Sequence, residues 1–140
     1  MLEFFCLTLV MSLVKLIMSL LLNYHFVIMQ HQCFHLIVYS SLKTNENLEV
    51  VKSIPLEKLM IETDAPWCEI RPTHAGFHYI KTKFDTKKKE KWQEGACVKG
   101  RNEPTHLIQV LEVLAAIKGL EIPEVAEIVF QNTMNVFFNK

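Results

Sequence analysis

The eight residues from Leu59 to Pro66, with the sequence LMIETDAP, constrain the fold of this chain more than any other stretch. Met60 and Ile61 favour a buried strand, whereas aspartate is rare inside strands and proline stops further ladder pairing. We therefore predict a short strand that delivers Asp64 at its C-terminal end, where α/β enzymes place metal ligands and bases. An aspartate before a proline also commonly begins a turn, and the local pattern alone favours that simpler role.

The residues before this stretch predict a helix that precedes the strand. Thr44 or Asn45 can cap a helix from Glu46 to Ser53, whose apolar positions share one face. Pro55 then ends or redirects it. A helix followed by a buried strand is half of a βαβ unit, so the order of elements predicts an α/β fold with a parallel sheet.

Two further helices are predicted at the C-terminal end of the chain. The first begins at Pro104, a residue suited to the first helical turn, and Gly119 follows its last apolar position. The second begins near Pro123 and runs on toward Phe138. Their apolar stripes predict core packing, and we find no cofactor-binding pattern in them.

Residues 65–103 form a long predicted connection dotted with aromatic side chains. Connections of this length are usually functional or disordered. The lysine-rich run from Lys87 to Lys91 suits either a solvated turn or a contact with phosphate groups. Because short lysine runs are common on surfaces, the sequence favours the solvated turn.

Composition divides the chain near residue 40. Residues 1–42 carry only two charged side chains, Glu3 and Lys15, whereas the remainder is densely charged. The apolar run over 4–22 approaches the length of a bilayer span and predicts a buried or membrane-associated helix.

The length and charge of the whole chain set broad limits. Its 140 residues suffice for one domain, and its formal net charge of zero gives no global attraction to nucleic acid. Its four cysteines form no CxxC pair, which argues against a zinc knuckle or a redox motif.

Three histidines lie in the first part of the chain, after the apolar run. His31 and His35 would share a face of a helix, but Gln32 stands where the HExxH metal motif has glutamate. We therefore expect His25, His31 and His35 to be packed or exposed rather than metal-bound. The stretch over 34–39 suits a strand as well as a helix.

Several motifs within residues 40–140 resemble the C-terminal part of the TatD-like metal-dependent deoxyribonucleases. The most specific are ETDAP at 62–66 and RNEP at 101–104, in this order and followed by two helices. Trp67-Cys68 and the TKKK sequence at 86–89 are most similar to the animal nuclear-type members. Weaker similarities lie at Ile54-Pro55, Val125-Ala126, Asn132-Thr133 and 136–138.

This resemblance implies the C-terminal fragment of a (β/α)₈ TIM-barrel hydrolase, which cleaves DNA phosphodiester bonds with divalent ions such as Mg²⁺, Mn²⁺ or Zn²⁺. Asp64 matches the family's aspartate at the end of the last strand, a metal ligand that helps to orient or deprotonate the attacking water. The metal lowers the pKa of bound water, so a nearby carboxylate can accept its proton. Arg101, Asn102 and Glu103 precede a helix on the same side of the barrel, where they would order the rim or approach the substrate.

The family's other ligands have no assignable counterpart in this sequence. The family also uses an HxH motif, a glutamate and two later histidines, and no HxH motif occurs here. A complete barrel takes about 250 residues, and catalytic metal ions take several ligands. We therefore expect an apolar, helical segment outside the family over 1–39 and a partial barrel over 40–140, in a chain inactive on its own.

Two alternatives remain open. Residues 4–22 could anchor a small membrane-associated or partner-binding protein. The chain could instead be an unstable product, whose strand and helices expose apolar faces that a whole barrel would cover. The family resemblance implies a nuclear or cytoplasmic location, and the first alternative implies a membrane. Nothing in the sequence indicates an oligomeric state.

Overall fold

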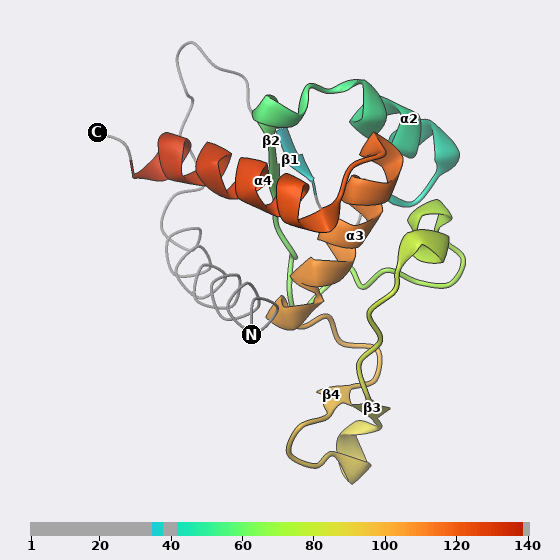
Figure 1. Cartoon of the computed structure of the whole chain (residues 1–140). Coiled ribbons are helices and arrows are strands. Elements are labelled where there is room, and N and C mark those ends of the chain that lie inside the picture. Colours follow the sequence, from blue (N-terminus) through green and yellow to red (C-terminus); the bar gives the residue numbers. More distant parts are fainter. Residues whose placement is uncertain (1–34, 38–41, 139–140) are drawn as a thin grey trace. The chain divides into compact units, whose positions relative to one another are not determined.

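A computed structural model of the chain describes residues 35–37 and 42–138 (Figure 1). The chain divides into two units, 1–32 and 33–140, and all described residues lie in the second. The helix predicted over 4–22 and the histidines at 25 and 31 therefore lie outside the described residues. Within 35–37 and 42–138, no helix is both long and apolar enough to cross a membrane.

A small parallel sheet organises the described part of the chain. Strand β1 (His35–Ile37) pairs in parallel with strand β2 (Leu59–Ile61), and Leu36 lies opposite Met60. Helix α2 (Asn45–Ser53) and a 3₁₀ turn at Leu56–Lys58 connect the two strands. The predicted order of helix then strand and the predicted parallel pairing are confirmed, and the two strands lie side by side behind the C-terminal helix in Figure 1.

Local capping explains where α2 begins. The Thr44 hydroxyl accepts a hydrogen bond from the Asn47 backbone N–H at 3.2 Å, which satisfies one of the free donors of the first turn. Of the two predicted caps, the structure uses Thr44. Leu48 and Val51 on the inner face of α2 are buried.

The strand pairing differs from the prediction at two points. The strand predicted to reach Asp64 ends at Ile61, although the Glu62 N–H still donates to the Ile37 carbonyl at 3.1 Å. The ladder stops because the chain turns at Asp64, where φ is 48°. Residues 35–37, at the end of a segment expected to be helical, form β1, which is the alternative that their pattern allowed.

The two C-terminal helices supply most of the core. Helix α3 (Leu107–Lys118) follows a 3₁₀ turn at Pro104–His106, so regular α-helix starts three residues later than predicted. Gly119 ends α3 with a left-handed φ of 69°, as a C-terminal glycine commonly does. Helix α4 (Ile122–Phe137) begins one residue before the predicted proline, which lies in its first turn. Fully buried side chains include Leu42, Leu59, Val110, Val113, Leu114 and Val125.

Polar side chains fix the helices against the strand and its neighbouring turns. The buried amide of Asn132 in α4 donates to the Leu56 carbonyl at 2.9 Å and to the Leu59 carbonyl at 2.8 Å. Gly76, in the 3₁₀ turn Ala75–Tyr79, lies so close to α3 that an added Cβ would meet Val113 Cγ1 at 3.1 Å. The Asn132 bonds fix the start of β2 against α4, and the close approach at Gly76 packs its 3₁₀ turn against α3.

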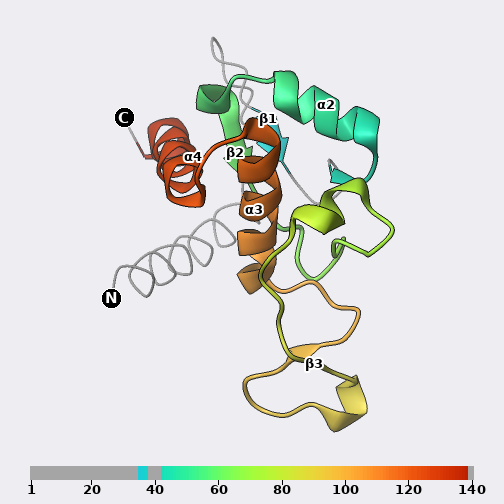
Figure 2. The same cartoon turned by 45° about the vertical axis from the view of Figure 1, so that its right-hand side comes forward.

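The long connection after β2 is ordered. It contains strand β3 (Thr86–Lys87), a 3₁₀ turn at Lys89–Lys91, and strand β4 (Cys97–Val98), which pairs in parallel with β3. In Figures 1 and 2 the β3–β4 pair lies beyond the beginning of α3, away from α2 and α4. The two ends of the segment that contains β3 and β4 both lie beside the start of α3.

Candidate functional site

The loop that carries Asp64 comprises residues 63–67, and we call it the Asp64 loop. Its first residue, Thr63, is buried, whereas the Asp64 side chain is exposed. The Thr63 hydroxyl accepts from the Ala65 N–H at 3.3 Å, and the Asp64 carbonyl accepts from the Trp67 N–H at 2.8 Å. The backbone of the loop is thus tied inward, and the carboxylate of Asp64 is left on the surface.

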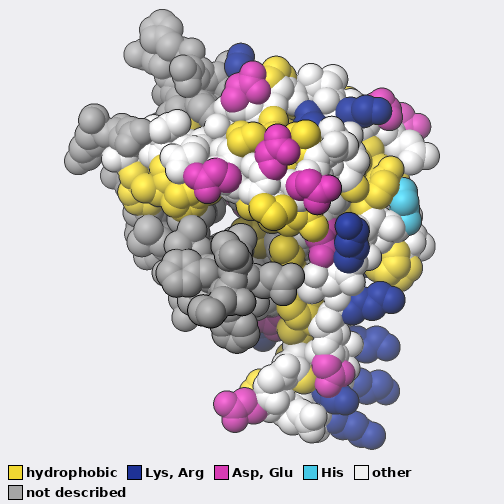
Figure 3. Space-filling model, in the orientation of Figure 1, with side chains coloured by type: hydrophobic (Ala, Val, Ile, Leu, Met, Phe, Trp, Pro, Cys, Tyr) yellow, Lys and Arg dark blue, Asp and Glu magenta, His cyan; other side chains and the backbone are white. Residues whose placement is uncertain are grey.

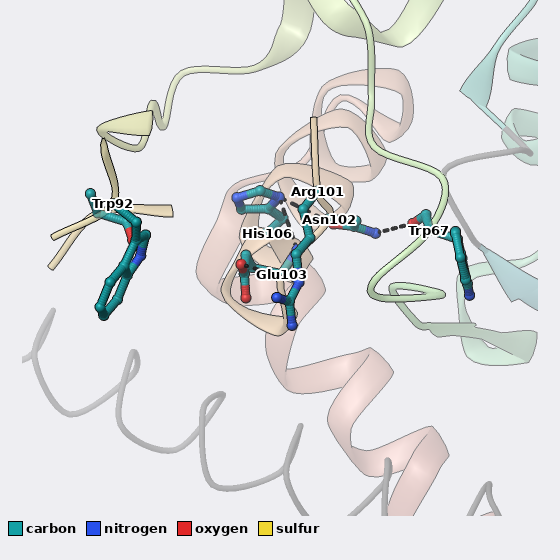
Figure 4. Close-up of polar contacts among 7 residues, drawn as sticks. Trp67, Trp92, Arg101, Asn102, Glu103 and His106 are labelled. Atoms are coloured by element: carbon teal, nitrogen blue, oxygen red, sulfur yellow. Dashed lines mark hydrogen bonds and ion pairs between the residues drawn. The ribbon is translucent and has the colours of Figure 1, made fainter. Parts of the chain in front are cut away.

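Asn102 holds both ends of the Asp64 loop. Its side chain is 1% exposed, and its amide donates to the Thr63 carbonyl and to the Trp67 carbonyl, the latter at 2.8 Å. Its own backbone N–H donates to the Pro66 carbonyl at 3.2 Å. Figure 4 shows the Asn102 side chain directed toward Trp67. One buried residue therefore joins two motifs that lie far apart in the sequence.

His106 supports Asn102 from the 3₁₀ turn that follows it. The two carbonyl acceptors fix the orientation of the Asn102 amide, so its oxygen faces His106 Nδ1 at 3.1 Å and Nδ1 must donate to it. A second contact, from the Glu103 N–H to the same nitrogen, is longer at 3.4 Å and cannot form in that tautomer. Burial lowers the pKa of His106, against weaker opposing effects of Glu103 and Glu69. The neutral ring is thus the form that supports the loop.

Arg101 and Glu103 have different environments from their neighbour Asn102. The Arg101 Nε lies 3.7 Å from a Glu103 carboxylate oxygen, and the Arg101 side chain is 57% exposed. The Glu103 side chain also caps the short 3₁₀ turn that follows. Figure 4 shows Arg101 and Glu103 beside each other, with the His106 ring next to them. Of the three predicted rim residues, Asn102 is buried and bonded to the Asp64 loop, whereas Arg101 and Glu103 form an ion pair in which the guanidinium stays exposed to solvent.

The described residues do not by themselves provide a complete metal site. Asp64 is a hard oxygen donor at the end of a parallel strand, which is the right chemistry and place for a divalent ion. Within 35–37 and 42–138, however, no group of three histidine, cysteine, aspartate or glutamate side chains gathers around one point. Asp64 therefore has the chemistry of one metal ligand, and the described residues do not complete a site around it.

Sequence reasoning identified the two motifs but not all of the residues that connect them. It places Asp64 at a strand end and Asn102 on a rim, and it assigns no role to His106. The spacing of four residues between Asn102 and His106, at the start of a helix, is the signal that could have revealed their contact.

Comparisons with known proteins agree on one family. The family model described as TatD related DNase matches residues 29–138, and thus begins before the predicted boundary at residue 40 and includes β1. The Deoxyribonuclease Tat-D of Schizosaccharomyces pombe is 53% identical over 98 residues, covering 69% of this chain and 31% of that protein. The Deoxyribonuclease Tat-D of Saccharomyces cerevisiae is 40% identical over 113 residues, covering 69% of this chain and 27% of that protein.

Solved structures give the same result for the fold. A TatD family hydrolase from Entamoeba histolytica matches with a TM-score of 0.72 and 40% identity, over 75% of this chain and 35% of that one. An uncharacterized amidohydrolase from Saccharomyces cerevisiae matches with a TM-score of 0.69 and 38% identity, over 74% of this chain and 33% of that one. The chain thus spans about a third of the length of the proteins it matches, and its described part is a helix-rich piece of their TIM-barrel fold.

Proposed function

Because the chain belongs to the TatD-related DNase family, a family of hydrolases, we propose that it supplies one corner of a metal-dependent deoxyribonuclease site. In this proposal the Asp64 carboxylate is one ligand of a divalent ion, Mg²⁺, Mn²⁺ or Zn²⁺, and DNA is the substrate. The remaining ligands belong to the part of the barrel that these 140 residues do not contain. A polypeptide of these residues alone therefore does not cleave DNA.

The clamp formed by Asn102 is the observation that carries the proposal. A carboxylate that merely began a surface turn would need no buried amide bonded to both flanks of its loop. Here Asn102 contributes three hydrogen bonds to Thr63, Pro66 and Trp67, while Asp64 itself stays exposed. Metal ligands require this kind of support, because their geometry must be fixed before the ion binds.

The first experiment compares the isolated chain with a chimera. The purified 140-residue chain is assayed for DNA cleavage with Mg²⁺, Mn²⁺ or Zn²⁺, and we expect no activity. In the chimera, residues 33–140 replace the matching C-terminal segment of the Schizosaccharomyces pombe Deoxyribonuclease Tat-D, and we expect metal-dependent cleavage.

Two variants of the chimera then test the role of Asp64. Asp64→Asn should lower kcat/KM by more than about 100-fold, since even the loss of a supporting partner of a metal ligand costs about 10–100-fold. Glu121→Gln is the matched control, because it removes one carboxylate charge at an exposed position that has no part in the loop. Equal activity of the two variants would refute the assignment of Asp64, and Asp64-dependent cleavage by the isolated chain would refute its inactivity.

The location of the protein follows the same proposal. A nuclear or cytoplasmic location is the one that the resemblance to the animal members favours. The competing prediction, a membrane anchor over 4–22, concerns residues outside the described part. We keep it as a second candidate that carbonate extraction of membranes can test, since a product released by carbonate would exclude it.

A further inference from the structure

Positive charge is concentrated in the excursion between the two site motifs. Residues 81–101, which we call the basic arm, hold eight of the fifteen lysines and arginines of the chain and only three of its fifteen acidic residues. The arm therefore carries a formal charge of +5, and the rest of the chain carries −5. The zero net charge of the whole sequence conceals this separation.

The basic arm is anchored at both ends beside the candidate site. At its start, the backbone N–H groups of Lys81 and Thr82 donate to the buried carboxylate of Glu112 in α3, at 2.9 and 3.1 Å. At its end, Arg101 directly precedes Asn102, which clamps the Asp64 loop. The parallel pair β3–β4 closes the arm upon itself between these two anchors. Its charges are thus held in place rather than carried on a loose loop.

The lysines of the arm face solvent and are largely unpaired. Lys87 lies 3.4 Å from Asp85, and Arg101 pairs with Glu103. Among the described residues, no carboxylate forms an ion pair with the other lysines of the arm, which are all exposed: Lys81, Lys83, Lys88, Lys89, Lys91 and Lys99. Figure 3 shows dark-blue side chains one above another along one side of the arm.

An exposed aromatic ring accompanies these charges. Trp92 is 54% exposed, although its indole N–H donates to the Ala96 carbonyl at 2.6 Å, so the ring is fixed and yet open to solvent. The other tryptophan of the chain, Trp67 in the Asp64 loop, is 73% exposed. Tryptophan is usually among the well-buried residues, so an exposed ring in the arm and another in the Asp64 loop need an explanation. Figure 4 shows Trp92 and Trp67 flanking the cluster of Arg101, Asn102 and His106.

We propose that the basic arm binds single-stranded DNA and leads the strand toward the Asp64 loop. The lysines contact successive phosphates, and the face of Trp92 stacks on an unpaired base. A positive groove combined with aromatic platforms is how proteins hold single strands, because every base has a face that can stack. Duplex DNA offers phosphates but no free base faces, so the exposed ring favours the single strand. The proposal rests on the proposed function for the choice of DNA, but binding is measurable without cleavage.

The first test measures the salt dependence of binding by the full 140-residue chain, without metal, to a fluorescent single-stranded oligonucleotide. Six contacting lysines should give a slope of about −4 in log K against log [salt]. Neutralising three of them, Lys88, Lys89 and Lys91, to glutamine should make the slope shallower by about 2 and weaken binding more than tenfold at low salt. The matched control neutralises Lys43, Lys52 and Lys58, three exposed lysines outside the arm. Equal effects of the two triple variants would overturn the proposal.

The second test separates stacking from charge. Trp92→Leu should weaken single-strand binding about tenfold and leave duplex binding unchanged, since stacking on one aromatic ring is worth about this much per base. Trp92→Phe keeps a ring and loses the bond to Ala96, so it should retain most of the affinity if the ring itself binds. Equal losses in both variants, or displacement of DNA by polyglutamate of matched charge, would overturn the proposal.

The outcomes also distinguish this inference from the proposed function. Arm-dependent binding without cleavage in the chimera would refute the nuclease and keep the arm. Asp64-dependent cleavage that is unchanged by the lysine and Trp92 variants would keep the nuclease and refute the role of the arm.

Discussion

Asn102 shows what a single residue contributes to this site. The sequence places it in an RNEP motif next to charged neighbours, and from that position it could equally have pointed outward to substrate. The structure buries it and uses all of its amide hydrogens on carbonyls of the Asp64 loop. The side-chain direction depends on a contact between segments far apart in the sequence, which is why local pattern alone could not predict it.

Replacing Asn102 should therefore destabilise the chain. Asn102→Ala leaves the Thr63 and Trp67 carbonyls without their side-chain donor, and we expect a loss of about 2–3 kcal/mol in the free energy of unfolding. Urea denaturation followed by circular dichroism measures it. Asn45→Ala, at the exposed start of α2, is the control and should change stability by well under 1 kcal/mol. A similar small change for Asn102→Ala would show that the clamp is not needed.

His106 makes the stability of the site depend on pH. Burial lowers its pKa in the folded chain, so below its ordinary value of about 6.5 the unfolded chain binds a proton that the folded chain does not. Stability should therefore be full above that pH and fall as the pH drops from about 7 toward 5. Glu103 and Glu69 oppose the shift and reduce it.

The variant His106→Gln isolates this contribution. It should flatten the decline in stability between pH 7 and 5, measured by urea denaturation at each pH. His74, whose pKa is also lowered by burial and by Lys43 and Arg71, is present in both proteins and cancels in the comparison. Identical pH slopes for the two proteins would mean that the charge on His106 does not matter.

At the scale of elements, the sequence predicted what local chemistry controls. The cap at Thr44, the proline at the start of α4 and the glycine after α3 all act within a few residues, and the structure confirms each of them. The sequence did not predict β3 and β4, because two-residue strands have no periodicity and form only by pairing with each other. The sequence also favours a solvated turn for the lysine run, because short lysine runs are common on surfaces.

Glu112 in α3 is a buried charged residue that the apolar periodicity of the helix did not reveal. It lies in the apolar stripe of α3, is 4% exposed, and accepts hydrogen bonds from the Lys81 and Thr82 N–H groups and from the Thr82 hydroxyl. A buried carboxylate is tolerated only where donors surround it, and here the donors are the first residues of the basic arm. Glu112 thus fixes the position at which the basic arm begins.

Removing that carboxylate should release the start of the arm. In Glu112→Ala the Lys81 and Thr82 N–H groups lose their acceptor, so we expect about 2–3 kcal/mol of destabilisation and faster amide hydrogen exchange at both positions. Glu127→Ala, an exposed change in α4, is the control and should leave exchange in the arm unchanged. Unchanged exchange in Glu112→Ala would mean that other contacts hold the arm.

At the scale of the whole molecule, the sheet is too small for the fold to which it belongs. A barrel closes only when its parallel strands form a complete ring, and the described sheet pairs β1 with β2 alone. Leu36 on β1 remains 43% exposed, although its partner Met60 is buried. In a complete barrel both faces of such a strand are covered. The isolated chain should consequently expose apolar surface that the chimera buries.

Leu36→Lys tests this in both settings. In the isolated 140-residue chain it should reduce binding of a hydrophobic dye, with little loss of structure, because the position is already open. In the chimera the same lysine is forced into a covered position, so the melting temperature should fall by several degrees. Val50→Lys is the matched control, since Val50 is 60% exposed on α2 and should tolerate the charge in both proteins. Two outcomes would show that the barrel is not what covers this strand. One is an isolated chain that is a monomer with one sharp unfolding transition and no dye binding. The other is a chimera that tolerates both lysine substitutions.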